Sequence, residues 1–159
     1  MKLIGIAIIF ICSAAAGFGY TAMLKQRQKY LDGLIKLVRF IRVQIECFSS
    51  PLDIIYADFT DEVLDKCGFT EILKNSGLST ALEQKKETLA LTDDTFELLS
   101  NFSSELGKSF SDEQVKHCDR YISVLEETAS EYAKELPKKC KTVKTLSLSV
   151  GAMAALLLI

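Results

Sequence analysis

The side chains that could do chemistry here are few: one histidine, five cysteines and several neighbouring acids. Catalysis needs an activated nucleophile, an acid–base pair, a metal or a cofactor. His117 has no partner at metal-ligand spacing, since Cys118 is merely adjacent to it. We expect His117 to lie at the edge of its helix, one turn from Tyr121, and to form a local hydrogen bond. The sequence therefore predicts no catalytic site and no metal site.

The five cysteines are odd in number, and no two of them lie two or three residues apart. Disulfide frameworks and zinc sites have paired, close spacings. We therefore predict free thiols that pack as small apolar side chains in a reducing compartment. These residues are Cys12, Cys47, Cys67, Cys118 and Cys140.

The segment Gly107-Lys108-Ser109 is similar to the end of a phosphate-binding loop. That loop requires a glycine five residues earlier, where Phe102 stands, and a preceding strand, where the pattern is helical. A helix stop followed by a short turn explains the segment better. We expect no cofactor, no small-molecule substrate and no enzymatic activity.

Charge is distributed in three blocks along the chain, although the net charge is only −2. Residues 25–45 hold six basic side chains against one acid, and residues 134–144 hold five against one. All other acids lie between Glu46 and Glu131. Acid pairs such as Asp61-Glu62 and Asp93-Asp94 are interpreted as solvated, or as first-turn acids that complement a helix dipole. The acidic middle argues against nucleic acid as a partner.

Both ends of the chain are uncharged and apolar. Residues 3–24 contain no charge, and about 20 such residues in a helix cross a hydrocarbon core of about 30 Å. Residues 145–159 are also uncharged but fewer, and Thr142 and Val143 extend them. We predict transmembrane helices over 1–24 and 142–159. The alternatives are a cleaved signal peptide at the first end and a buried terminal helix at the second.

The basic clusters predict the topology, because positively charged flanks stay on the cytoplasmic side. Both clusters lie on the inner flanks of the apolar ends, so residues 25–141 are expected to form a cytosolic domain. An exported protein with a cleaved signal and a tail anchor is the alternative. Retention of residues 1–24 in purified membranes would exclude it.

The middle of the chain has helical periodicity and no sustained two-residue alternation. We expect a first helix that continues to about Cys47 and a second helix from Pro51 to Gly68. Two short helices should follow, one around residues 71–75 and one after Ser79. The last two helices are expected from Thr92 to Gly107 and from Ser111 to Pro137. The last has an apolar seam in steps of three and four from Val115 to Leu136, which we expect to pack along the first helix. Pro137 should kink or stop it. The predicted fold is all-α: an antiparallel helical bundle of about six helices, flanked by two terminal transmembrane helices.

One motif exceeds what helix formation requires. Leu106, Gly107, Lys108 and Ser109 are followed by Gln114 and His117, and this pattern resembles the stage III sporulation protein AB family of endospore-forming bacteria. The resemblance covers essentially the whole chain. Two departures are Phe110, where the family has Asp after the Ser, and the basic run that follows Pro137.

The resemblance implies a non-enzymatic membrane platform, similar to the cytosolic helical domain of type II secretion and type IV pilus platform proteins. It implies a cytosolic ATPase partner, stage III sporulation protein AA, and sibling subunits of the channel between mother cell and forespore. The expected location is the outer forespore membrane, with the soluble domain in the mother-cell cytoplasm. Glu126, Glu127 and Glu131 are candidate docking residues on the last helix.

A second hypothesis is a small membrane-anchored sensor or regulator with a helical cytosolic domain. His117 motivates it, because histidine changes its charge near neutral pH.

Overall fold

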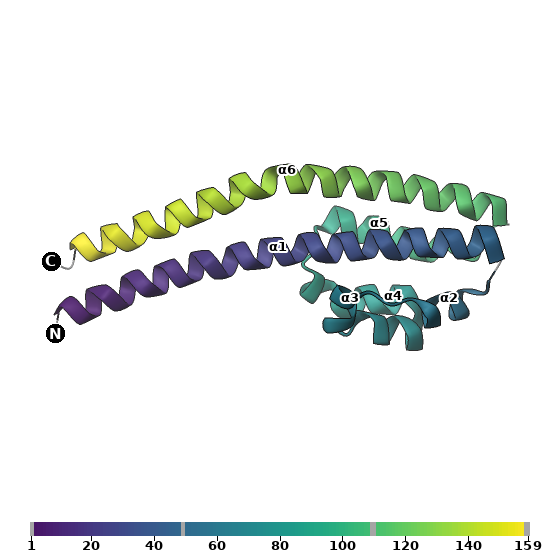
Figure 1. Cartoon of the computed structure of the whole chain (residues 1–159), viewed down its shortest axis with the longest axis horizontal. Helices are drawn as coiled ribbons and strands as arrows, with labels where there is room; N and C mark the ends of the chain where they lie inside the picture. The colour runs from purple at the N-terminus through teal and green to yellow at the C-terminus, as the bar shows by residue number, and fades with distance from the viewer. Residues whose placement is uncertain (1, 49, 109–110, 158–159) are drawn as a thin grey trace. The chain divides into compact units, whose positions relative to one another are not determined.

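The computed structural model describes residues 2–48, 50–108 and 111–157, with side chains for 11–48, 50–108 and 112–153. This part of the chain forms six helices and no strand (Figure 1). The all-α prediction with about six helices is confirmed. The helices are α1 (Lys2–Phe48), α2 (Leu52–Asp58), α3 (Glu62–Lys66), α4 (Phe69–Leu89), α5 (Asp93–Glu105) and α6 (Ser111–Leu157).

The chain divides into two compact units, and each long helix contributes to both. The first, which we call the arm unit, contains residues 1–28 and 131–159. The second, the body unit, contains residues 29–130. Each unit is described separately below.

The body unit is held together by one apolar core. Within it, α4 packs against α2, α3 and α5. The predicted stripe of α1 supplies fully enclosed side chains, of which Leu34 and Ile41 have no exposed surface. From α6, Cys118, Tyr121, Leu125 and Ala129 are buried, in steps of three and four. These side chains join those of α1 in the same cluster. Cys118, Leu125 and Ala129 belong to the predicted seam, but Tyr121 is buried where the sequence predicted Ile122, which is only partly buried.

The single helix predicted from Pro51 to Gly68 is wrong, because the chain forms two helices there. α2 ends at Asp58, Phe59 is extended, and α3 starts after Asp61. The Asp61 carboxylate accepts hydrogen bonds from the amides of Val63 and Leu64, at 3.0 and 3.2 Å. This cap satisfies amides at the start of α3 that have no intrahelical partner. Asp61 is also 9% exposed, so of the two interpretations of the Asp61-Glu62 pair, the solvated one is wrong for Asp61, which lies at the N-terminus of α3.

The other predicted boundaries follow local signals. Gly77 has φ 80° and ψ 175°, which interrupts α4 between the two short helices that the sequence predicts. Thr92 caps α5, and its hydroxyl accepts from the amide of Thr95 at 3.3 Å. Pro137 does not stop α6, which continues to Leu157. A proline inside a helix removes one backbone donor and crowds the carbonyl four residues earlier, which weakens one turn but here does not end the helix.

The arm unit is an antiparallel pair formed by the first part of α1 and the last part of α6, which run side by side in Figure 1. The two helices approach closely where Ser13 donates a hydrogen bond to the carbonyl of Ser147 at 2.5 Å. Gly17 is buried there, and a Cβ added to it would lie only 2.7 Å from the Ser147 Cβ. Only glycine therefore fits at this crossing.

Among the residues that the structure describes, no helix combines the length and the apolarity that a bilayer crossing requires. The two transmembrane helices of the predicted fold are therefore not confirmed.

Candidate functional site

The motif residues lie at the corner between α5 and α6. α5 ends at Glu105, and Leu106 leaves the helix with its amide still bonded to the carbonyl of Phe102. Gly107 follows with φ 79°, a conformation that glycine adopts without the cost a Cβ would bring. α6 then begins at Ser111. Gly107 thus takes the left-handed conformation where α5 ends, and the first turns of α6 lie beside the end of α5.

The Glu105 carboxylate is the centre of this corner. Its Oε2 accepts a hydrogen bond from the Tyr121 hydroxyl at 2.9 Å and lies 3.2 Å from Nδ1 of His117. The Tyr121 ring is buried and lies 5.1 Å from the Phe102 ring, centroid to centroid. Two residues of α6 thus hold the last residue of α5. The prediction of a locally bonded edge histidine is confirmed, and its bonding partner is Glu105.

The hydrogen bonds lower the pKa of Glu105, a carboxyl group that is already ionised at neutral pH. The hydrogen bond from the Tyr121 hydroxyl is the main cause that lowers the pKa of Glu105; burial opposes it, and His117 adds a smaller lowering effect. Burial and the bond to Glu105 raise the pKa of Tyr121. At neutral pH the corner therefore holds a carboxylate that accepts hydrogen bonds and a phenol that donates one.

The hollow at the corner is small. Phe102, Glu105, Leu106, Gln114 and His117 line it, and its volume is about 10 Å³. That is room for a single water molecule and not for an organic ligand. Burial raises the pKa of the neighbouring Cys118 thiol to about 11, so the thiol is protonated and a poor nucleophile at neutral pH.

The structure thus brings three of the six motif residues together: Leu106, Gln114 and His117 line the hollow. Gly107 shapes the turn beside them, and Lys108 is exposed. Ser109 lies outside the described residues. Among the described side chains, no group of three or more His, Cys, Asp or Glu residues could hold a metal ion.

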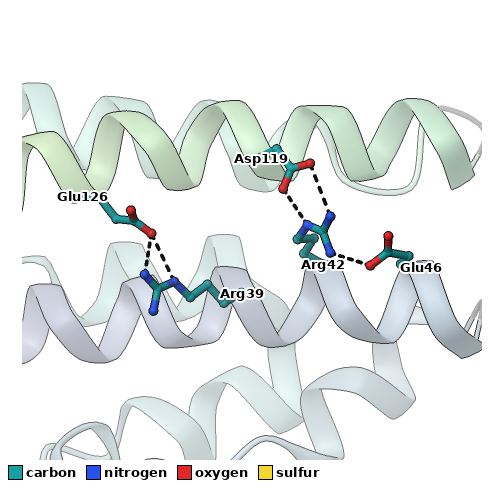
Figure 2. Close-up of polar contacts among 5 residues, drawn as sticks. All are labelled: Arg39, Arg42, Glu46, Asp119 and Glu126. Carbon is teal, nitrogen blue, oxygen red and sulfur yellow. Dashed lines mark hydrogen bonds and ion pairs between the residues drawn. The ribbon is translucent and has the colours of Figure 1, made fainter.

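The candidate docking acids on α6 differ in their surroundings. Glu126 accepts two hydrogen bonds from the Arg39 guanidinium, at 2.6 and 3.1 Å (Figure 2). Glu127 and Glu131 are exposed. Glu126 is therefore already part of the packing between α1 and α6 in the body unit, whereas Glu127 and Glu131 are accessible.

A second ion-pair cluster joins the same helices. The Arg42 guanidinium bonds to the Asp119 carboxylate at 2.5 and 3.5 Å and also to Glu46, one turn along α1 (Figure 2). These bonds raise the pKa of Arg42, first through Asp119 and then through Glu46. Arg42 thus links α1 to α6 a turn away from the Arg39 pair.

Sequence reasoning missed Glu105 altogether, and it missed the partners of Asp61 and Glu126. Glu105 directly precedes the motif and could have been included with it. The carboxylate of Asp61 lies 3.1 Å from the ammonium of Lys36, and Glu126 pairs with Arg39 over 87 residues. No spacing rule connects residues so far apart, because the packing of the helices decides which charges meet.

The comparisons with known proteins agree with the motif. The family model described as stage III sporulation protein AB matches residues 2–159. Comparison with curated proteins and with solved structures returned no match.

Proposed function

Because this chain belongs to the stage III sporulation protein AB family, which gives it a role in sporulation, we propose that it acts there as a non-enzymatic membrane platform. The arm unit is the membrane anchor, and the body unit docks a cytosolic ATPase similar to stage III sporulation protein AA. The body unit also meets sibling subunits of the channel. In this proposal the anchor lies in the outer forespore membrane, and the body unit faces the mother-cell cytoplasm.

The observation that carries the proposal is the opposite charge of the two units. The arm unit has eight lysines and arginines against two acids, whereas the body unit has 11 against 19. Anionic headgroups attract basic segments beside a membrane and repel acidic ones. A membrane surface therefore favours the arm unit, and the acidic body unit favours a partner with a basic face.

The surface of the arm unit supports its role as an anchor. Apolar side chains that a water-soluble helix pair would bury are exposed on both of its helices; they include Ile11, Phe18, Met23, Leu146, Val150 and Met153. Residues 3–24, which contain the first three of these side chains, carry no charge. We propose that the apolar ends of these helices, residues 1–24 and 142–159, lie in the hydrocarbon phase as the predicted transmembrane helices, and that the charged residues 25–28 and 131–141 lie outside it.

The docking proposal can be tested with the full chain. The tagged protein is purified in mild detergent from sporulating cells, and bound proteins are identified by mass spectrometry. Recovery of a secretion-type ATPase supports the platform. A helical, folded protein that recovers no ATPase contradicts docking.

A charge reversal then locates the surface. Glu127→Lys is the informative variant, because Glu126→Lys would also break the pair with Arg39. Glu83→Lys on α4 is the matched control, since Glu83 is also exposed. We expect weaker, less salt-sensitive ATPase binding for Glu127→Lys alone. Equal binding by both variants would remove Glu127 from the interface.

The contact between Glu105 and His117 favours a second candidate function, a membrane-anchored sensor or regulator. Protonation of His117 would strengthen its attraction to the Glu105 carboxylate and tighten the corner. His117→Gln should then abolish a pH-dependent change in the stability of the corner, followed by hydrogen exchange of α5. An identical pH profile for the two proteins would exclude this function.

A further inference from the structure

The arm unit contains a groove that neither the platform nor the corner uses. Its volume is about 270 Å³. It is lined from α1 by Tyr20 and Leu24, and from α6 by Lys138, Lys139, Thr142 and Val143. Every lining residue belongs to the arm unit.

The walls of the groove have two chemical characters. Leu24, which is 6% exposed, and Val143 supply an apolar wall. Lys138 and Lys139 supply two ammonium groups, and both residues are exposed. A ligand that fits both walls carries negative charge at one end and hydrocarbon at the other.

The charges nearby leave the groove positive. The Lys139 ammonium is 2.6 Å from Glu135, one of only two acids in the unit. The Arg27 guanidinium lies over the ring of Tyr132, 4.8 Å from its centroid. The Tyr132 hydroxyl donates to the carbonyl of Leu24 at 3.2 Å, which fixes that ring beside the groove wall. The Glu135 carboxylate and the Lys139 ammonium thus offset each other, and Lys138 and Arg27 supply the net positive charge beside the groove.

The groove also lies where charge gives way to hydrocarbon on both helices. Leu24 is the last residue before Lys25, and Lys144 is the last charged residue of the chain. The Lys144 ammonium lies 5.2 Å from the centroid of the exposed Phe18 ring. A long lysine lying along an apolar face, with its ammonium free to reach the headgroups, is typical of a membrane–water boundary.

From this juxtaposition of two lysines, an apolar wall and exposed apolar helix faces, we propose that the groove binds the headgroup of an anionic phospholipid. The lipid phosphate contacts Lys138 and Lys139, and an acyl chain lies along Leu24 and Val143. A free phosphate ion would leave the apolar wall in water, so the lipid is the better fit. The inference rests on the proposed anchoring of the arm unit in a membrane.

The chain has no tryptophan, so a single Phe18→Trp substitution provides a fluorescent reporter that leaves the groove lining unchanged. The full-length reporter protein is reconstituted in phosphatidylcholine vesicles that contain brominated phosphatidylglycerol or brominated phosphatidylcholine at the same mole fraction. Bromine quenches tryptophan on contact, and the ratio of the two quenching constants gives the lipid preference. We expect phosphatidylglycerol to be preferred about fivefold, the effect of one lysine near an anionic surface.

Lys138→Glu tests the groove, and Lys141→Glu is the matched control on the same helix, since Lys141 is exposed but does not line the groove. Lys138→Gln is a milder second variant, and circular dichroism verifies that each protein is helical. We expect both substitutions of Lys138 to bring the ratio of the quenching constants close to one. Lys141→Glu should leave the ratio near its original value.

Three results would overturn the inference. The first is an equal loss of the phosphatidylglycerol preference in Lys138→Glu and Lys141→Glu, which would mean diffuse attraction to the membrane surface. The second is no preference in the reporter protein. The third is loss of the preference when inorganic phosphate is added at constant ionic strength. Failure of the anchoring proposal looks different. In that case the protein does not float with pure phosphatidylcholine vesicles in high salt, whatever its lipid preference.

Discussion

Replacing Asp61 with alanine should destabilise the body unit by about 2 kcal/mol, because this side chain both caps α3 and bonds to α1. Loss of an N-cap costs about 1 kcal/mol and up to about 2. The Lys36 partner is 64% exposed, so its ion pair adds less than about 1 kcal/mol. The carboxylate itself is 7% exposed, which makes the two freed amides of α3 hard for water to reach.

Two further substitutions separate the cap from the ion pair. Asp61→Asn keeps a capping oxygen and removes the charge, so it should cost about 0.5–1 kcal/mol. Lys36→Gln should cost no more than that. Asp94→Ala is the control, an exposed first-turn acid of α5 whose loss should cost within about 0.5 kcal/mol.

The same carboxylate should give a pH dependence of known sign. Burial alone would raise the pKa of Asp61, but the hydrogen bond from the Leu64 amide and that from Lys36 outweigh it, and the pKa is lowered. An Asp pKa near 3.9 in the unfolded chain then means that the contribution is complete well above pH 4 and is lost as pH falls through the lower folded value. Asp61→Asn should lack this part of the acid sensitivity.

The assay is urea unfolding of the full chain in mild detergent, followed by far-ultraviolet circular dichroism at pH 7 and at about pH 3. If Lys36→Gln costs as much as Asp61→Ala, the ion pair and not the cap holds α3. A cost below about 0.5 kcal/mol for Asp61→Ala would refute both roles.

Three further predictions concern other parts of the molecule. Leu34→Ala should cost about 2–5 kcal/mol in the same assay, because this fully buried side chain would leave a cavity; a loss under about 1 kcal/mol would contradict its core position. Gly17→Leu should increase hydrogen exchange along the arm unit, whereas Gly19→Leu should not, since a Cβ there meets nothing within 4 Å; similar exchange in both would argue against the close crossing. Glu105→Gln should cost up to about 1 kcal/mol, since the group is half exposed, and should lower the pKa of Tyr121, measured by its ultraviolet titration.

The helix boundaries that the sequence predicts correctly depend on neighbouring residues. Thr92 accepts from the amide three residues later, and Gly77 interrupts α4 through its own backbone angles. The apolar stripe of α1 is likewise readable, because burial on one face follows from a period of 3.6 residues. These features require no knowledge of what lies across the core.

The features that the sequence does not predict correctly have causes that local periodicity does not show. The apolar pattern from Leu52 to Val63 continues through the break between α2 and α3, so periodicity alone could not show it. The cap formed by Asp61 is itself local, but the bond that holds its carboxylate against Lys36 of α1 joins residues 25 positions apart, which no local pattern shows. Glu126 was predicted as a docking residue but pairs with Arg39 of α1, and the sequence does not show this partner 87 residues away.

The charge blocks of the sequence acquire a physical meaning in the two units. Because basic residues gather in the arm unit and acids in the body unit, an anionic surface attracts one and repels the other. Added salt should therefore weaken lipid binding by the arm unit and partner binding by the body unit, through charges of opposite sign. Only the partner binding should respond to Glu127→Lys, and only the lipid preference to Lys138→Glu. The two proposals can thus fail independently, which is what makes each of them testable in the intact chain.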